Sequence, residues 1–171
     1  MIKIDISKCT GCKRCETACA FHHTGKVNNH LARIKVVNIY ESGIDSPVVC
    51  QQCKERYCLS CPSNAITIGS LGQVIMSPTN CTLCGACEKK CPIGAIEIFN
   101  DIVYVCDLCG GNPKCVLACT EGAITFEPQT KHISLAEHKK VSRNKTPSEK
   151  RFNYVVKLGE SLQEVWRKNR A

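Results

Sequence analysis

Short stretches in which apolar and polar residues alternate recur through the first 135 positions of the chain. Each stretch is only a few residues long, which is typical of short strands with one buried face. The predicted strands are residues 1–6, 65–68, 74–76, 95–99, 102–105, 123–126 and 132–135. Turn-forming residues at 69–72, 100–101 and 128–130 join the last six of these strands into three predicted hairpins.

The stretch 20–49 departs from this arrangement. Residues 31–39 form a strand-like run, and residues 47–49 lead directly into Cys50. We therefore predict an inserted hairpin in this part of the chain.

Near the C-terminus the apolar pattern changes to a helical period. Thr146, Pro147 and Glu149 form a capping box with proline at the first helical position, which predicts a helix over residues 147–169. The apolar residues at helical spacing are Phe152, Val155, Val156, Gly159, Leu162, Val165 and Trp166. Residues 151–158 also alternate as a strand would, but the well-formed cap favours the helix.

Sixteen cysteines, far above ordinary usage, fall into four groups of four with none left over. The groups are Cys9, Cys12, Cys15 and Cys19; Cys50, Cys53, Cys58 and Cys61; Cys81, Cys84, Cys87 and Cys91; and Cys106, Cys109, Cys115 and Cys119. The third group has the spacing C-x2-C-x2-C-x3-C and is followed by Pro92, which is the run that binds [4Fe–4S] clusters in bacterial ferredoxins. The array predicts iron–sulfur clusters, with structural zinc as the alternative.

The strands around the cysteine groups are expected to exclude water from the clusters. The apolar side chains expected to cover them are Ile66, Ile68, Ile96, Ile98 and Ile124. His22 and His23 follow the first group directly, but each group already has four cysteines. We therefore interpret the two histidines as loop residues or as hydrogen-bond partners at a cluster edge rather than as iron ligands.

The location of the protein bears on the state of its thiols. The N-terminal residues carry no apolar signal region, so we expect a reducing cytoplasmic location in which disulfides do not form. A folded iron–sulfur subunit could still be exported with a partner that bears a twin-arginine signal. No apolar run approaches membrane-spanning length, and no integral membrane segment is expected.

The formal charge of +8 suggests a nucleic-acid partner only until the clusters are counted. Sixteen thiolates contribute −16 and four oxidised cluster cores contribute roughly +8, so the loaded protein is close to neutral. Aromatic residues are few, and no stacking platform for bases is evident. The basic residues within the cysteine groups are Lys13, Arg14, Lys89, Lys90 and Lys114. They are interpreted as counter-charge or partner surface, or as solvated side chains.

The four cysteine groups, the insertion after the first group and the final CDLCGGNPKC resemble the four-cluster ferredoxin-like electron-transfer subunits. Such subunits accompany molybdenum- and tungsten-pterin oxidoreductases, nickel–iron hydrogenases and carbon monoxide dehydrogenase. The resemblance covers roughly residues 1–135, and the chain is most similar to the small subunits that partner tungsten aldehyde oxidoreductases. It implies an α+β fold of tandem bacterial-ferredoxin-like modules with four [4Fe–4S] clusters, to which the chain adds a long C-terminal helix.

The resemblance also implies how the groups share ligands, since the first and fourth groups form one module and the second and third the other. The implied ligand sets are Cys9, Cys12, Cys15 and Cys119; Cys50, Cys53, Cys58 and Cys91; Cys81, Cys84, Cys87 and Cys61; and Cys106, Cys109, Cys115 and Cys19. Cys61 departs from the family pattern because only two residues separate it from Cys58, a shift of about 100° on a helix. Ala20 and Thr120 stand where proline commonly follows the last cysteine of a group.

We interpret residues 1–138 as the four-cluster domain and residues 139–171 as a basic linker with an amphipathic helix. The helix is expected either to pack on its own domain or to dock on a partner through Trp166. Docking of residues 146–171 on an identical chain, head to tail, would give a filament of clusters.

The function expected from this sequence is that of an electron conduit, with no catalytic residue predicted. Neither a phosphate-binding loop nor a dinucleotide-binding glycine fingerprint occurs. The expected partners are a catalytic tungsten- or molybdenum-pterin subunit and a flavin- and NAD-linked subunit. The alternatives are a subunit or assembly factor of a hydrogenase, formate dehydrogenase or carbon monoxide dehydrogenase, a freestanding polyferredoxin, and a zinc-stabilised binding module.

Overall fold

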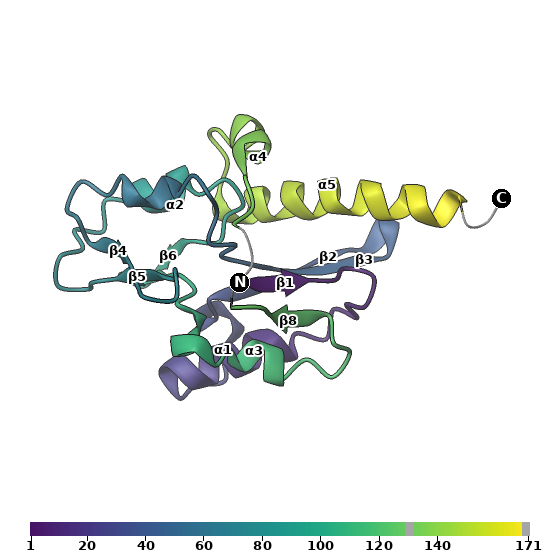
Figure 1. The fold of residues 1–171 in the computed structure, drawn as a ribbon, viewed down its shortest axis with the longest axis horizontal. Coiled ribbons are helices and arrows are strands. Elements are labelled where there is room, and N and C mark those ends of the chain that lie inside the picture. The colour runs from purple at the N-terminus through teal and green to yellow at the C-terminus, as the bar shows by residue number, and fades with distance from the viewer. Residues whose placement is uncertain (129–131, 169–171) are drawn as a thin grey trace.

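The fold consists of small helices and two-stranded antiparallel sheets, with one long helix at the C-terminal end (Figure 1). A computed structural model describes residues 1–128 and 132–168. Four short 3₁₀ turns lie at Asn29–Leu31, Tyr40–Ser42, Tyr57–Leu59 and Leu108–Gly111. This mixed architecture agrees with the predicted α+β class and with ferredoxin-like modules, and the described strands close no barrel.

One hydrophobic core joins the two ends of the cysteine-containing region. Strand β1 (Ile2–Ile4) pairs with β8 (Ile124–Phe126), and helix α1 (Arg14–Thr24) packs against α3 (Lys114–Leu117) below them in Figure 1. The fully buried Ile2 and the buried Ile124 lie in this core together with cysteines of the first and fourth groups. Segments more than a hundred residues apart in sequence therefore form one structural unit.

A second core is built from the middle of the chain. Strand β4 (Ile66–Ile68) pairs with β5 (Val74–Met76), and β6 (Glu97–Phe99) pairs with β7 (Ile102–Tyr104). Helix α2 (Ala86–Lys90) lies between the two hairpins in sequence. Asn100 and Asp101 form the turn of the second hairpin with φ of 48° and 57°, as a two-residue turn requires. Both of these predicted hairpins are confirmed.

The inserted hairpin is also confirmed. Strand β2 (Ile34–Ile39) pairs in antiparallel register with β3 (Ile44–Val49), which leads into Cys50. The beginning of the predicted insertion is not part of this hairpin, because residues 20–24 continue α1 up to a left-handed C-cap at Gly25.

The third predicted hairpin is wrong. Strand β8 pairs with the N-terminal strand β1 instead of with residues 132–135, which form no strand, and the expected turn at 128–130 lies partly outside the described residues. The backbone of Ile133 instead accepts a hydrogen bond from the amide of Lys54 at 2.9 Å. A local turn signal was overridden here by the long-range pairing that closes the first core.

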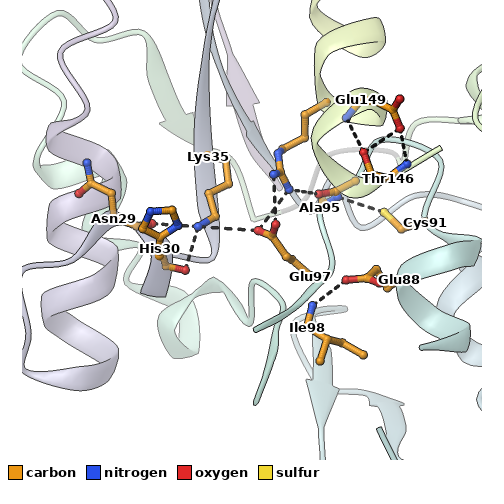
Figure 2. Close-up of polar contacts among 12 residues, drawn as sticks. Asn29, His30, Lys35, Glu88, Cys91, Ala95, Glu97, Ile98, Thr146 and Glu149 are labelled. Atoms are coloured by element: carbon orange, nitrogen blue, oxygen red, sulfur yellow. Dashed lines mark hydrogen bonds and ion pairs between the residues drawn. The ribbon is translucent and has the colours of Figure 1, made fainter. Parts of the chain in front are cut away.

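The C-terminal region is helical over most of its length. Helix α4 (Ala136–Val141) occupies part of the segment interpreted as a linker, and α5 (Pro147–Lys168) confirms the predicted long helix against the strand alternative. The capping box is present, because the Glu149 amide donates to Thr146 Oγ1 at 3.3 Å and the Thr146 amide donates to Glu149 Oε2 at 2.7 Å (Figure 2).

Helix α5 packs on the body of the protein as far as Gly159, which is buried against Ile44 of β3, and its last turns are more exposed. Tyr154 and Val155 are buried in the second core, and α5 contacts β2 and β3. Near the C-terminal end, Val165 and Trp166 are 51% and 39% exposed. The C-terminal end of α5 extends past the β2–β3 hairpin in Figure 1. Within the described residues, no helix combines the length and apolar character that a membrane span needs.

Candidate iron–sulfur sites

Four sets of thiols converge in the structure, and each set draws on two of the sequence groups. The first thiol set, lining a cavity beside the start of α1, is Cys9, Cys12, Cys15 and Cys119. Gly11 lies in the same loop with a φ of +67°, and a Cβ there would come within 2.7 Å of the Asp45 side chain. Glycine is therefore required for this loop to fold tightly against β3.

The second thiol set lies under the helical tail. It consists of Cys50, Cys53, Cys58 and Cys91, and it lines a cavity that is covered by Tyr57, Ile96 and Leu135. The amide of Ala95 donates a hydrogen bond to Cys91 Sγ at 3.3 Å (Figure 2). Ile96 is thus confirmed as one of the side chains that cover a set of thiols.

The third thiol set brings Cys61 into the group of cysteines that begins with Cys81. The members, which line one cavity, are Cys61, Cys81, Cys84 and Cys87. Ser63 lies 3.4 Å from Cys61 Sγ, and this contact lowers the pKa of the Cys61 thiol below its usual range. The cavity is also lined by Ile66 and Ile98. Ile68, expected to cover a cluster, is 39% exposed and is not among the residues that line it.

The fourth thiol set is the most buried and consists of Cys19, Cys106, Cys109 and Cys115. Burial is the largest cause that raises the pKa of these four thiols, and charges on neighbouring thiols of the set add to the shifts of Cys19, Cys106 and Cys115. The amide of Arg33 donates to Cys19 Sγ at 3.2 Å. His23 Nε2 lies 3.7 Å from Cys109 Sγ, while His22, His23 and Cys109 together form a group that could hold a metal ion. The position of His23 agrees with a hydrogen-bond partner at a cluster edge.

Burial and mutual repulsion disfavour the thiolate forms of these convergent cysteines when no cation is present. Burial is the largest cause that raises the pKa of Cys58 to about 12, of Cys115 to about 12 and of Cys87 to about 11. Cluster binding needs thiolates, so a positively charged core has to supply the opposing charge. Four sulfurs with backbone N–H donors around them form a donor set that fits a [4Fe–4S] cluster, and every described cysteine is a free thiol.

Some thiols also act on the pKa of a thiol in another set. Burial is the largest cause that raises the pKa of Cys15, Cys106 and Cys58, and a thiol of another set adds to each shift. The added influence comes from Cys115 on Cys15, from Cys50 on Cys106 and from Cys87 on Cys58. The second set therefore has neighbours in both the fourth and the third sets.

Two polar networks that sequence reasoning missed join the units. Gln52, only 1% exposed, donates through Nε2 to the Cys106 carbonyl at 3.2 Å and accepts from the Val74 amide at 3.0 Å. Lys35 donates to the carbonyls of Asn29 and His30 at 2.9 Å and faces Glu97 at 3.8 Å (Figure 2). No local pattern marks these residues, because each acts across elements that are distant in sequence.

The Glu97 carboxylate also ties the tail to this junction. Arg151 of α5 contacts Glu97 at 3.3 Å and donates to the Gly94 carbonyl at 2.9 Å. Lys35 of the inserted hairpin, Glu97 of β6 and Arg151 of the tail therefore form one charged network.

Comparison with protein families gives two matches, both described as a 4Fe-4S binding domain. They cover residues 1–24 and 74–97. These stretches contain the first cysteine group and the third.

Curated relatives match over longer stretches. The polyferredoxin-like subunit of an aliphatic sulfonate oxidoreductase from Pyrococcus furiosus is 40% identical over 70% of this chain and 71% of its own. An uncharacterized ferredoxin from Methanocaldococcus jannaschii is 31% identical over 86% of each chain. The beta subunit of an NADH-dependent phenylglyoxylate dehydrogenase from Aromatoleum evansii is 34% identical over 79% of this chain. The match covers only 30% of the length of that subunit.

Proposed function

Because this chain belongs to the polyferredoxin-like electron-transfer subunits with 4Fe-4S binding domains, we propose that it carries four [4Fe–4S] clusters between a catalytic oxidoreductase subunit and another redox carrier. The observation that supports the proposal most directly is the convergence of all sixteen thiols into four sets of four. Bound clusters would supply one-electron carriers, and no substrate chemistry is assigned to this subunit.

In this proposal each thiol set holds one cluster, and groups one and four and groups two and three form tandem modules. The ligands are those of the first, second, third and fourth thiol sets, as the family resemblance implies. Cys61 completes the third set in spite of its short spacing; its place in the cavity with Cys87 favours this role. The backbone amides of Arg33 and Ala95 support the sulfurs, and apolar side chains such as Ile96 exclude water.

The proposed partner is a tungsten- or molybdenum-pterin oxidoreductase. Support comes from the family resemblance and from the Pyrococcus relative, whose name makes it a subunit of an oxidoreductase. A flavin- and NAD-linked subunit is proposed as the further partner. We place the complex in the reducing cytoplasm, where sixteen thiols remain available for iron.

The metal content of the complex tests the proposal. The chain serves as bait and is purified without oxygen from its native host. We expect about sixteen iron atoms per chain, four clusters of four, together with tungsten or molybdenum. Nickel in place of tungsten or molybdenum would indicate that the partner is a hydrogenase or carbon monoxide dehydrogenase. Iron without a second metal would favour a freestanding carrier. Zinc with little iron would contradict the function proposed here.

The last turns of α5, which carry Val165 and Trp166, are proposed to dock on a neighbouring subunit, either the catalytic subunit or a like chain in a head-to-tail filament. Because Val165 and Trp166 are exposed apolar residues on an extending helix, Trp166→Ala is expected to weaken the association about thirtyfold, or about 2 kcal/mol. Analytical ultracentrifugation of the complex and of the isolated subunit measures this change and identifies which neighbour is lost.

Phe152→Ala provides the matched control for this experiment. Phe152 is 46% exposed on the same helix but lies in the part that packs on the body. Unchanged mass in Trp166→Ala would show that this end of α5 docks on nothing. Deletion of the whole segment 146–171 is a poorer test, since it also removes Tyr154 and Val155 from the second core.

A further inference from the structure

Three consecutive backbone carbonyls at the end of α2 receive ammonium groups from the helical tail. Lys150 Nζ of α5 donates to the carbonyls of Glu88 and Lys89 at 3.0 and 2.9 Å. Lys139 Nζ of α4 donates to the carbonyl of Lys90 at 2.8 Å. The next residue is Cys91, a member of the second thiol set. The tail therefore places two positive charges at the C-terminal end of the helix that presents this thiol.

Lys150 is unusually situated for a lysine. The residue is only 2% exposed. Its ammonium forms no ion pair with a carboxylate of residues 1–128 and 132–168. Burial lowers the pKa of this ammonium, and the Cys91 thiolate is the largest influence that opposes the shift. A buried charge is tolerated when an opposite charge compensates it. For Lys150 the largest opposing charge lies at Cys91 of the second thiol set, and the Glu88 carboxylate adds to it.

Lys139 is placed in the same electrostatic surroundings. Burial lowers the pKa of its ammonium, and Cys91 again opposes the shift most. The ammonium lies 5.2 Å from the centre of the Tyr57 ring, which covers the cavity of the second set. Both lysines thus approach the second thiol set from the tail side.

The effect of these charges on a bound cluster follows from charge counting. Four thiolates and an oxidised core of about +2 give a site of about −2, and one-electron reduction makes it about −3. A fixed positive charge nearby attracts the reduced site more strongly than the oxidised one. It therefore favours reduction, and the low dielectric of a buried position enlarges the effect.

We propose that Lys150, assisted by Lys139, raises the reduction potential of the cluster at the second thiol set, so that the helical tail is a redox-tuning element as well as a docking arm. The inference rests on the proposed function, because it requires the second set to hold a cluster. Both lysines are positioning residues that act on the cluster through space and through α2. The second set has neighbours in both the fourth and the third sets, so a raised potential there makes this site retain an electron more readily than they do.

The test compares Lys150→Met with the wild type by redox titration of the fully loaded chain, monitored by electron paramagnetic resonance. At a fixed potential the ratio of reduced to oxidised form of one cluster is expected to fall about tenfold, equivalent to about 59 mV for one electron, while the other three clusters titrate unchanged. Lys150→Arg, which keeps the charge, is expected to restore most of the wild-type ratio.

Lys157→Met is the matched control. Lys157 belongs to the same helix, but its side chain is 48% exposed and pairs with Glu137 at 2.8 Å. Its removal changes the net charge equally and is expected to shift no cluster. An equal shift in this control would overturn the proposal, because net charge alone would then explain the result.

The iron content of the purified chain distinguishes a failure of the proposed function from a failure of the tuning role. Low iron in the wild-type chain contradicts the proposed function itself, whereas full iron with unchanged potentials in Lys150→Met overturns only the tuning role. If Lys150→Met does not bind four clusters, Lys139→Met supplies the same comparison at a less buried position, with Lys139→Arg as its charge-keeping partner. A downward shift of one cluster in Lys139→Met supports the proposal, and its absence contradicts it.

Discussion

Removal of iron is expected to unfold both cores of this protein. The first core buries Cys15, Cys19, Cys106 and Cys115, and the second buries Cys58, Cys87 and Cys91. The strands around them are three to six residues long and pair only two by two, which is too little for independent stability. Metal binding supplies folding free energy in such domains, about 10–16 kcal/mol per site for structural zinc.

Circular dichroism during anaerobic treatment with an iron chelator and an oxidant measures this loss. We expect the far-ultraviolet signal to collapse as the iron-dependent absorbance near 400 nm disappears, and protease sensitivity to increase over the whole chain. Refolding is expected only after iron, sulfide and reductant are returned. A metal-free chain that kept its helical signal and protease resistance would contradict the view that the clusters organise the fold.

Gly94→Ala is expected to detach the start of the helical tail from the second module. Gly94 has a φ of +65°, and a Cβ there would lie 2.1 Å from the backbone oxygen of Pro147 and 2.9 Å from its carbonyl carbon. Backbone atoms cannot rotate away as a side chain could, so either Gly94 or the first turn of α5 must move. The Gly94 carbonyl also accepts the hydrogen bond from Arg151, which the displacement would break. We expect a destabilisation of about 3 kcal/mol.

Gly122→Ala is the control for this substitution. Gly122 follows Cys119 by three positions, as Gly94 follows Cys91, and its φ of +64° is nearly the same. Among the described residues, none beyond its two chain neighbours places an atom within 4 Å of the Cβ it would gain, so only the cost of the left-handed backbone remains, about 1 kcal/mol. Anaerobic denaturant unfolding of the loaded proteins measures both changes. Equal losses in the two variants would show that the contact with Pro147 contributes nothing.

The sequence alone determined the local units of this protein. Period-two patterns with turn residues predicted the hairpins β4–β5 and β6–β7, because a two-residue turn such as Asn100–Asp101 fixes the pairing of the strands beside it. The capping box at Thr146 likewise predicted the start of α5. The spacing of the cysteines indicated four groups of metal ligands, since spacing reflects how a loop wraps around a cluster.

Tertiary structure decided which segments meet. Strand β8 pairs with β1 rather than with its neighbour in sequence, and Cys119 thereby joins Cys9 across the chain. The placement of Lys150 against α2, of Gln52 between two thiol sets and of Arg151 on Glu97 leaves no periodic trace in the sequence. The physical reason is that hairpins and caps depend on near neighbours, whereas a buried charge is placed by the packing of distant elements and by the opposite charge it finds there.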